Sequence, residues 1–212
     1  MSYIKPFLIL ALFSIHLDAN AFEHLNLPLN EKMLENKKNA QPCKSPALAE
    51  KSFLKNFHYG CFCGKNYPKI EHPSHKKYQK LNLNERQELI SEYYKIKPSD
   101  DIDKVCMQHD ICYLSQGKKA QTCNDSLYKE LKKIKYAFRN TSKRKEPHIK
   151  RCRHLSTDMA LAFKTVFTLG EDFSISKLFT LSLSTPFSLS SGFIHSFDYP
   201  KEDERCNLLD LK

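Results

Sequence analysis

The sequence predicts a mainly α-helical domain that is cross-linked by disulfide bonds. Apolar residues recur at the three- and four-residue spacing of a helix face in four segments, 85–95, 101–115, 123–138 and 152–168. The chain also holds eight cysteines, and an even number in an exported chain is typical of a disulfide framework. Together these observations favour a small helical core that gains stability from covalent cross-links.

The first 21 residues are expected to be a secretory signal peptide. Lys5 precedes an apolar stretch from Phe7 to Leu17, and the small residues Ala19 and Ala21 form a cleavage site. A membrane anchor needs about 18 or more apolar residues, and polar residues interrupt this stretch. We therefore expect a secreted protein, extracellular or periplasmic, with one domain over 22–212.

The formal net charge of +10 favours a partner with an anionic surface. Between 129 and 153, eleven lysines and arginines stand against two acidic residues. Such a run is usually a solvated face, and adsorption to an anionic phospholipid membrane is the alternative. Nucleic acid is disfavoured as a partner by the export signal and by the absence of a recognisable nucleic-acid motif.

The run Cys106–Tyr113, with the sequence CMQHDICY, is the most informative part of the chain. Neighbouring residues on a helix diverge by about 100°, so His109 and Asp110 can serve two different partners. Upstream, Tyr59–Gly64 reads YGCFCG and holds two of the five glycines. A loop of backbone carbonyls beside an aspartate is a calcium site in outline.

These two runs, in this order, resemble the calcium loop and the catalytic helix of secreted phospholipase A2. The resemblance covers 59–66 and 98–131. The sequence of the second run is similar to the short-loop branches of that family. It implies a phospholipase A2-like helical core with a calcium loop over 59–66 and a catalytic helix pair over 98–138. Residues 67–97 are then an insertion, and 171–212 a C-terminal extension.

The resemblance implies calcium-dependent hydrolysis of the sn-2 ester of glycerophospholipids, with release of a fatty acid and a lysophospholipid. His109 is the expected base, because a neutral imidazole can take a proton from water. Asp110 is the expected Ca²⁺ ligand, together with the backbone carbonyl oxygens of Phe62, Gly64 and Asn66.

The chain departs from the family pattern at several positions, and the larger departure concerns the residue that orients the histidine. The carboxylate that follows the cysteine of the second helix and bonds the histidine is replaced by Asn124. An amide oxygen can orient an imidazole, but it cannot stabilise the imidazolium as an anion does. A small change in helix phase could bring in Asp125 instead, and Asp158 is a more distant candidate. Tyr113 is placed to support whichever residue fills this role.

The alternative function is a catalytically weak, phospholipase-like protein that binds a membrane or a receptor.

The resemblance also implies two disulfides, Cys63–Cys106 and Cys112–Cys123. The remaining four cysteines are expected to form two more pairs, and Cys61 with Cys206 is the preferred one. A zinc module is the competing interpretation, because Cys61, Cys63 and Cys106 could ligate a metal with His109. The export signal and the even cysteine count favour disulfides over zinc.

The segments around this core are weakly patterned. Residues 22–50 are expected to form an N-terminal arm that Cys43 pins. Within the insertion, Asn84 with Gln87 three positions on predicts a capping box for the inserted helix. That helix is either a lid over the site or a surface decoration. Alternating apolar residues predict a small strand or hairpin within 173–199.

Overall fold

The computed structural model describes residues 21–22, 25–44, 58–64, 68, 80–117, 120–169, 199–201 and 203–211. This part of the chain is mainly helical, as the sequence predicts. The α-helices are α1 (Glu31–Lys38), α3 (Leu83–Tyr93), α4 (Asp101–Gln116), α5 (Gln121–Asn140) and α6 (Pro147–Leu169). A 3₁₀ helix, η1 (Leu208–Leu211), lies near the C-terminus.

Two pairs of short strands accompany the helices within the described residues. Strand β1 (Gln41–Pro42) pairs in parallel with β4 (Ile96–Lys97). Strand β2 (His58–Tyr59) pairs antiparallel with β3 (Cys63–Gly64), and this hairpin carries the run YGCFCG. The strand or hairpin predicted within 173–199 and the predicted signal peptide fall almost entirely on residues that the structure does not describe.

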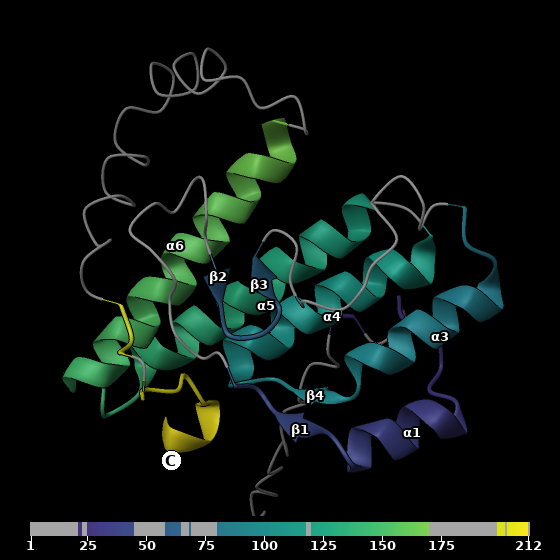
Figure 1. Cartoon of the computed structure of the whole chain (residues 1–212). Helices are drawn as coiled ribbons and strands as arrows, with labels where there is room; N and C mark the ends of the chain where they lie inside the picture. Colours follow the sequence, from purple (N-terminus) through teal and green to yellow (C-terminus); the bar gives the residue numbers. More distant parts are fainter. Residues whose placement is uncertain are drawn as a thin grey trace, which may run out of the picture.

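The helices pack in series, with α1 on α3, α3 on α4, α4 on α5 and α5 on α6. Figure 1 shows α5 between α4 and α6, with α1 and α3 on the other side of α4. Large buried side chains from all these layers form one core, among them Phe22, Met33, Phe62, Ile102, Leu127, Phe138 and Leu155. In the last helix, whose apolar residues are expected to face the core, Leu155 and Met159 are buried there.

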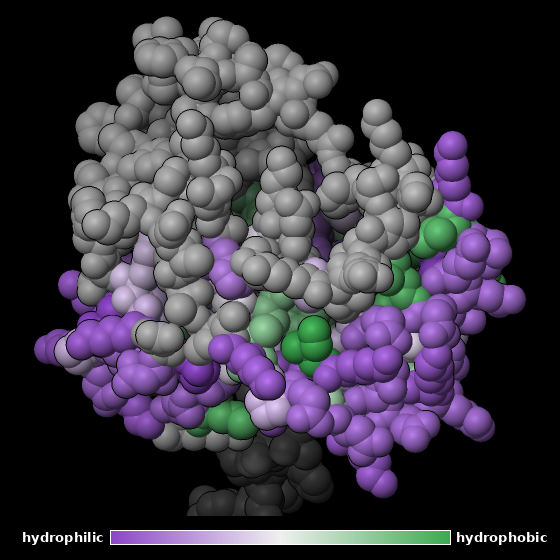
Figure 2. Space-filling model, in the orientation of Figure 1, coloured by the Kyte–Doolittle hydropathy of each residue, from purple (hydrophilic) through white to green (hydrophobic). Residues whose placement is uncertain are grey.

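The described surface is largely polar. Figure 2 shows hydrophilic side chains over most of the described surface in that view, with small hydrophobic areas between them. The exposed large hydrophobic residues are Leu29, Leu34, Leu83, Tyr136 and Leu209. No helix in the described part of the chain is long and apolar enough to cross a bilayer.

The inserted helix has a capping box, but two residues earlier than predicted. Asn82 Oδ1 accepts a hydrogen bond from Glu85 N, and the Glu85 carboxylate accepts one from Asn82 N. The prediction with Asn84 and Gln87 is therefore wrong. A carboxylate is a stronger acceptor than an amide at the positive end of a helix, so Glu85 selects Asn82 as its partner.

Helix α1 was not predicted, because its sequence is polar on most sides. Met33 is its buried residue, and Asn30 caps it by accepting from Met33 N. The side chain of Asn36 donates to Ser91 O of α3 at 2.8 Å, and Lys32 forms an ion pair with Glu88. The N-terminal arm is thereby attached to the inserted helix.

All eight cysteines are paired in four disulfides, which favours the disulfide framework over the zinc module. Two predicted disulfides are confirmed, Cys63–Cys106 and Cys112–Cys123. The preferred pair Cys61–Cys206 is wrong, because the structure has Cys43–Cys61 and Cys152–Cys206. The physical reason is the β1–β4 pairing, which continues as Cys43 N donates to Lys97 O and brings Cys43 to the loop.

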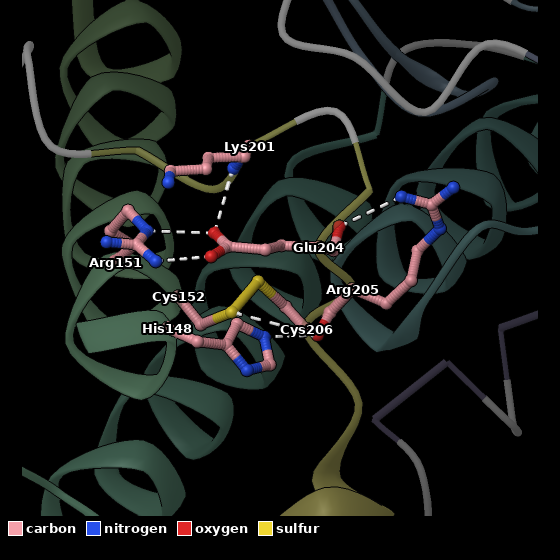
Figure 3. A network of polar contacts seen from close by, with 7 residues as sticks. All are labelled: His148, Arg151, Cys152, Lys201, Glu204, Arg205 and Cys206. Carbon is pink, nitrogen blue, oxygen red and sulfur yellow. Dashed lines mark hydrogen bonds and ion pairs between the residues drawn. A yellow bond between two sulfur atoms is a disulfide. The ribbon is translucent and has the colours of Figure 1, made fainter. Parts of the chain in front are cut away.

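The described residues 199–201 and 203–211, here called the C-terminal strap, bind to three helices. Figure 3 shows the contacts with α6. Glu204 pairs with the Arg151 guanidinium of α6 through both carboxylate oxygens, and His148 Nε2 lies 2.7 Å from Arg205 O. At the start of α4, Asp100 accepts from Cys206 N at 2.9 Å and Asp101 from Leu208 N at 2.7 Å. The third helix is α5, against which η1 packs.

The Arg151–Glu204 pair predicts a pH dependence of stability. Its hydrogen bonds lower the pKa of the Glu204 carboxyl to about 2. A depressed pKa stabilises the folded state above the unfolded pKa, about 4.3, and this contribution is lost as the pH falls toward 2. Glu204→Gln should therefore lower the free energy of unfolding by about 1–2 kcal/mol at pH 7 and by progressively less below pH 4. Urea unfolding at several pH values measures this. The exposed Glu146→Gln is the matched control, and a pH-independent gap would contradict the assignment.

Candidate active site

Helix α4 carries the candidate catalytic residues and is fixed at both ends. Asp100 caps its N-terminus by accepting from Asp103 N at 3.0 Å. At its C-terminus Gly117 adopts a φ of 64°, and Arg86 Nη1 of α3 donates to Ser115 O at 3.1 Å. A side chain on Gly117 would meet that guanidinium, because a Cβ there would lie 2.5 Å from Arg86 Nη1.

The β2–β3 loop is held by a buried carboxylate of α4. Asp103 is fully buried, and its two oxygens accept from the backbone N–H groups of Phe62 at 2.8 Å and Cys61 at 3.0 Å. Ser99 N donates to the same carboxylate at 2.9 Å. A Cβ on Gly60 would lie 2.3 Å from Asp103 Cγ, so close docking of the loop requires glycine. Burial raises the pKa of the Asp103 carboxyl.

A second carboxylate connects this loop to the C-terminal strap. The hydroxyl of buried Tyr59 donates to Asp100 Oδ2, and the same oxygen accepts from Cys206 N. Burial, and then Asp100, raise the pKa of Tyr59, so it stays a protonated donor. Three distant segments therefore meet on one oxygen atom.

His109 is buried between α4 and α5 and faces Asn124. Its Nε2 lies 3.0 Å from Asn124 Oδ1, and the Tyr113 hydroxyl donates to the same oxygen. The imidazole and phenol rings pack with centroids 4.3 Å apart. Since an amide oxygen carries no hydrogen, Nε2 must hold the proton. In the neutral ring, Nδ1 is then the basic nitrogen.

Asp110 lies beside that basic nitrogen. Its Oδ1 is 3.5 Å from His109 Nδ1, and burial raises the pKa of the carboxyl to about 6. Its Oδ2 is buried and has no hydrogen-bond partner among the described residues. Buried acceptors are normally satisfied, so this oxygen fits a cation ligand. Calcium suits such a site because it binds oxygen donors.

The other expected calcium ligands are backbone carbonyls of the loop. Phe62 and Gly64 flank Cys63, whose disulfide to Cys106 fastens the loop one turn before Asp110. Asn66 lies outside the described residues. No group of three or more His, Cys, Asp or Glu side chains within the described ranges could hold a metal, so any calcium here needs main-chain oxygens.

The structure separates the candidate partners of the histidine. Asn124 contacts it, whereas Asp125 is exposed and accepts from Gln121 Nε2 at 2.9 Å. Asp158 of α6 instead accepts from the Tyr199 hydroxyl at 2.7 Å. Asn124 therefore has the geometry expected of the orienting group.

The inserted helix is part of the framework of this site. Its Tyr93 ring stacks on Phe62 of the loop with centroids 5.8 Å apart. Leu89 and Ile90 are buried in the core with it. Helix α3 is thus more than a surface decoration. The structural roles of Asp100, Asp103 and Tyr93 were not predicted. For the two aspartates, the sequence offered one signal, which is the acidic start of the helix that carries the motif CMQHDICY.

Comparison with known proteins adds no identification, because no protein-family model, curated protein or solved structure matches this chain. The case for a function therefore depends on the residues and their geometry.

The loop anchor gives a prediction about stability. Asp103→Asn should lower the free energy of unfolding by about 2–4 kcal/mol, because an amide cannot accept all three backbone hydrogen bonds and leaves buried donors unsatisfied. Chemical denaturation measures the loss. The control is Asp125→Asn, which changes an exposed carboxylate and should alter stability by less than about 0.5 kcal/mol. Equal losses would show that Asp103 does not anchor the loop.

Proposed function

We propose that this protein is a secreted, calcium-dependent, phospholipase A2-like hydrolase that cleaves the sn-2 ester of glycerophospholipids. The observation that carries the proposal is the arrangement around His109. Asn124 and Tyr113 fix its Nε2 side, and Asp110 lies beside Nδ1 with an unsatisfied buried oxygen. The four disulfides and the resemblance of the sequence motifs support it further.

In the proposed reaction His109 acts as the general base. Asn124 keeps the proton on Nε2, so Nδ1 accepts a proton from the attacking water. The burial of the ring restricts its orientation, which keeps this nitrogen aligned with the reacting ester. Tyr113 helps to hold Asn124 in place by donating to the same amide oxygen.

Asp110 and the carbonyl oxygens of Phe62, Gly64 and Asn66 would hold calcium. When bound, the ion supplies Lewis-acid polarisation of the ester carbonyl and stabilises its developing negative charge. The chain contributes a rigid loop for this purpose, because Asp103 and the Cys63–Cys106 disulfide fix it to α4.

The alternative function is a catalytically weak, phospholipase-like protein that binds membranes or a receptor. The specific observation in its favour is the neutral Asn124, since an amide does not stabilise the imidazolium that forms when water loses its proton. Release of fatty acid from mixed phospholipid vesicles, with calcium and with a chelator, decides between the two functions.

Two variants separate the base from the metal ligand. His109→Gln should abolish hydrolysis, with a loss of at least about 10²–10⁴-fold, while calcium titration and the melting temperature stay nearly unchanged. Asp110→Asn should weaken calcium binding and hydrolysis together, because it removes the carboxylate ligand. Comparable turnover in wild type and His109→Gln would overturn the catalytic assignment. An unchanged calcium titration in Asp110→Asn would place the metal site elsewhere.

The orienting residue is tested by restoring the charge. Asn124→Asp should raise the turnover number by about tenfold or more, because a carboxylate at 3.0 Å from Nε2 stabilises the imidazolium. Asp125→Ala should change turnover by less than about twofold, since Asp125 points to Gln121. The opposite ranking of the two variants would show that Asp125 reaches the imidazole. No release of fatty acid by wild type or Asn124→Asp would favour the binding protein.

A further inference from the structure

The positive charge of this protein is concentrated in one part of the chain. Residues 129–153 hold eleven basic and two acidic side chains, which is +9 of the formal net charge of +10. They cover most of α5, the α5–α6 connection and the start of α6. A surface with an excess of positive charge produces a positive potential, which attracts anionic partners.

The cations on α5 are ordered by the helix. Leu127, Leu131, Ile134 and Phe138 form its buried side. Lys129, Lys132, Tyr136 and Arg139 recur at three- and four-residue spacing on another side, and we call these four residues the basic face. Tyr136 in its middle is 45 % exposed. At a rise of about 1.5 Å per residue, this face extends over about 15 Å.

Two of the ion pairs among the described residues involve this segment. Glu130 pairs with Lys133, which lies beside the basic face, and Glu204 pairs with Arg151. Among the described residues, no acidic side chain forms an ion pair with Lys129, Lys132 or Arg139.

An aromatic contact also brings two cations together at the edge of this face. Lys132 Nζ lies 5.3 Å from the ring centroid of Tyr128, and Lys164 Nζ of α6 lies 5.5 Å from it. The Tyr128 ring therefore gathers positive charge at this edge, where a phosphate group would interact favourably with both cations.

We propose that the basic face binds the head groups of an anionic phospholipid surface. Long basic side chains around an exposed tyrosine suit a lipid interface, where the phenol ring lies at head-group level and the cations contact phosphates. The straight side of one helix fits a flat surface. Asn124 projects from a different side of α5, toward His109, so this adsorption face is separate from the residues proposed for catalysis. The proposal holds for a hydrolase and for a binding protein alike.

The test is co-sedimentation of the full mature protein with vesicles in the presence of a chelator. Vesicles of phosphatidylglycerol and phosphatidylcholine should bind wild type strongly, and pure phosphatidylcholine weakly. The triple variant Lys129→Gln, Lys132→Gln, Arg139→Gln should bind the anionic vesicles about 100-fold less, as expected for three lost cations near the surface. The matched control changes three exposed cations elsewhere, Lys37→Gln, Lys38→Gln and Lys97→Gln, and should stay within about threefold of wild type.

Equal losses in both triple variants would overturn the proposal, because net charge alone would then explain binding. Binding of wild type to duplex DNA or heparin, without binding to anionic vesicles, would also overturn it in favour of a soluble polyanion. Circular dichroism confirms that each variant is folded. Hydrolysis of dispersed short-chain phospholipid reports on catalysis separately, and the basic-face variant should match wild type there if the protein is a hydrolase.

Discussion

Two buried carboxylates at the start of α4 organise much of this structure. Asp103 accepts the backbone N–H groups of the β2–β3 loop, and Asp100 caps the helix while binding both Tyr59 and Cys206. Burying a carboxylate is unfavourable unless hydrogen bonds satisfy its oxygens, and each of these is satisfied by several donors. The loop, helix α4 and the C-terminal strap therefore hold one another in place.

Local patterns predicted the parts of the site that lie close together in sequence. The resemblance of the sequence motifs indicated His109, Asp110 and Asn124, and the structure brings Asn124 to the imidazole. Helices α4 and α5 also followed from their apolar spacing. In these cases the deciding contacts lie within one helix or between two helices joined by a short connection, so the pattern of the sequence already contains the geometry.

Long-range contacts were the part that the sequence could not specify. The partner of Cys61 depends on the parallel pairing of β1 with β4, which leads Cys43 to the loop. In the sequence, Asp103 looks like any other acidic residue in the first turn of a helix. Its role depends on a hydrogen bond from Cys61 N, which lies 42 residues upstream. Both contacts depend on how distant segments of the chain fold onto one another. Helical periodicity does not predict this arrangement.

The bond from Cys206 to Asp100 has a consequence for the order of assembly. The Cys112–Cys123 disulfide closes over 11 residues and can form early, whereas Cys152–Cys206 spans 54 and requires the C-terminal strap. Because a ribosome delivers the strap after α6, Tyr59 and the start of α4 receive their shared partner only after the helices have been synthesised. Until the strap is in place, the β2–β3 loop lacks the part of its support that runs from Tyr59 through Asp100 to Cys206.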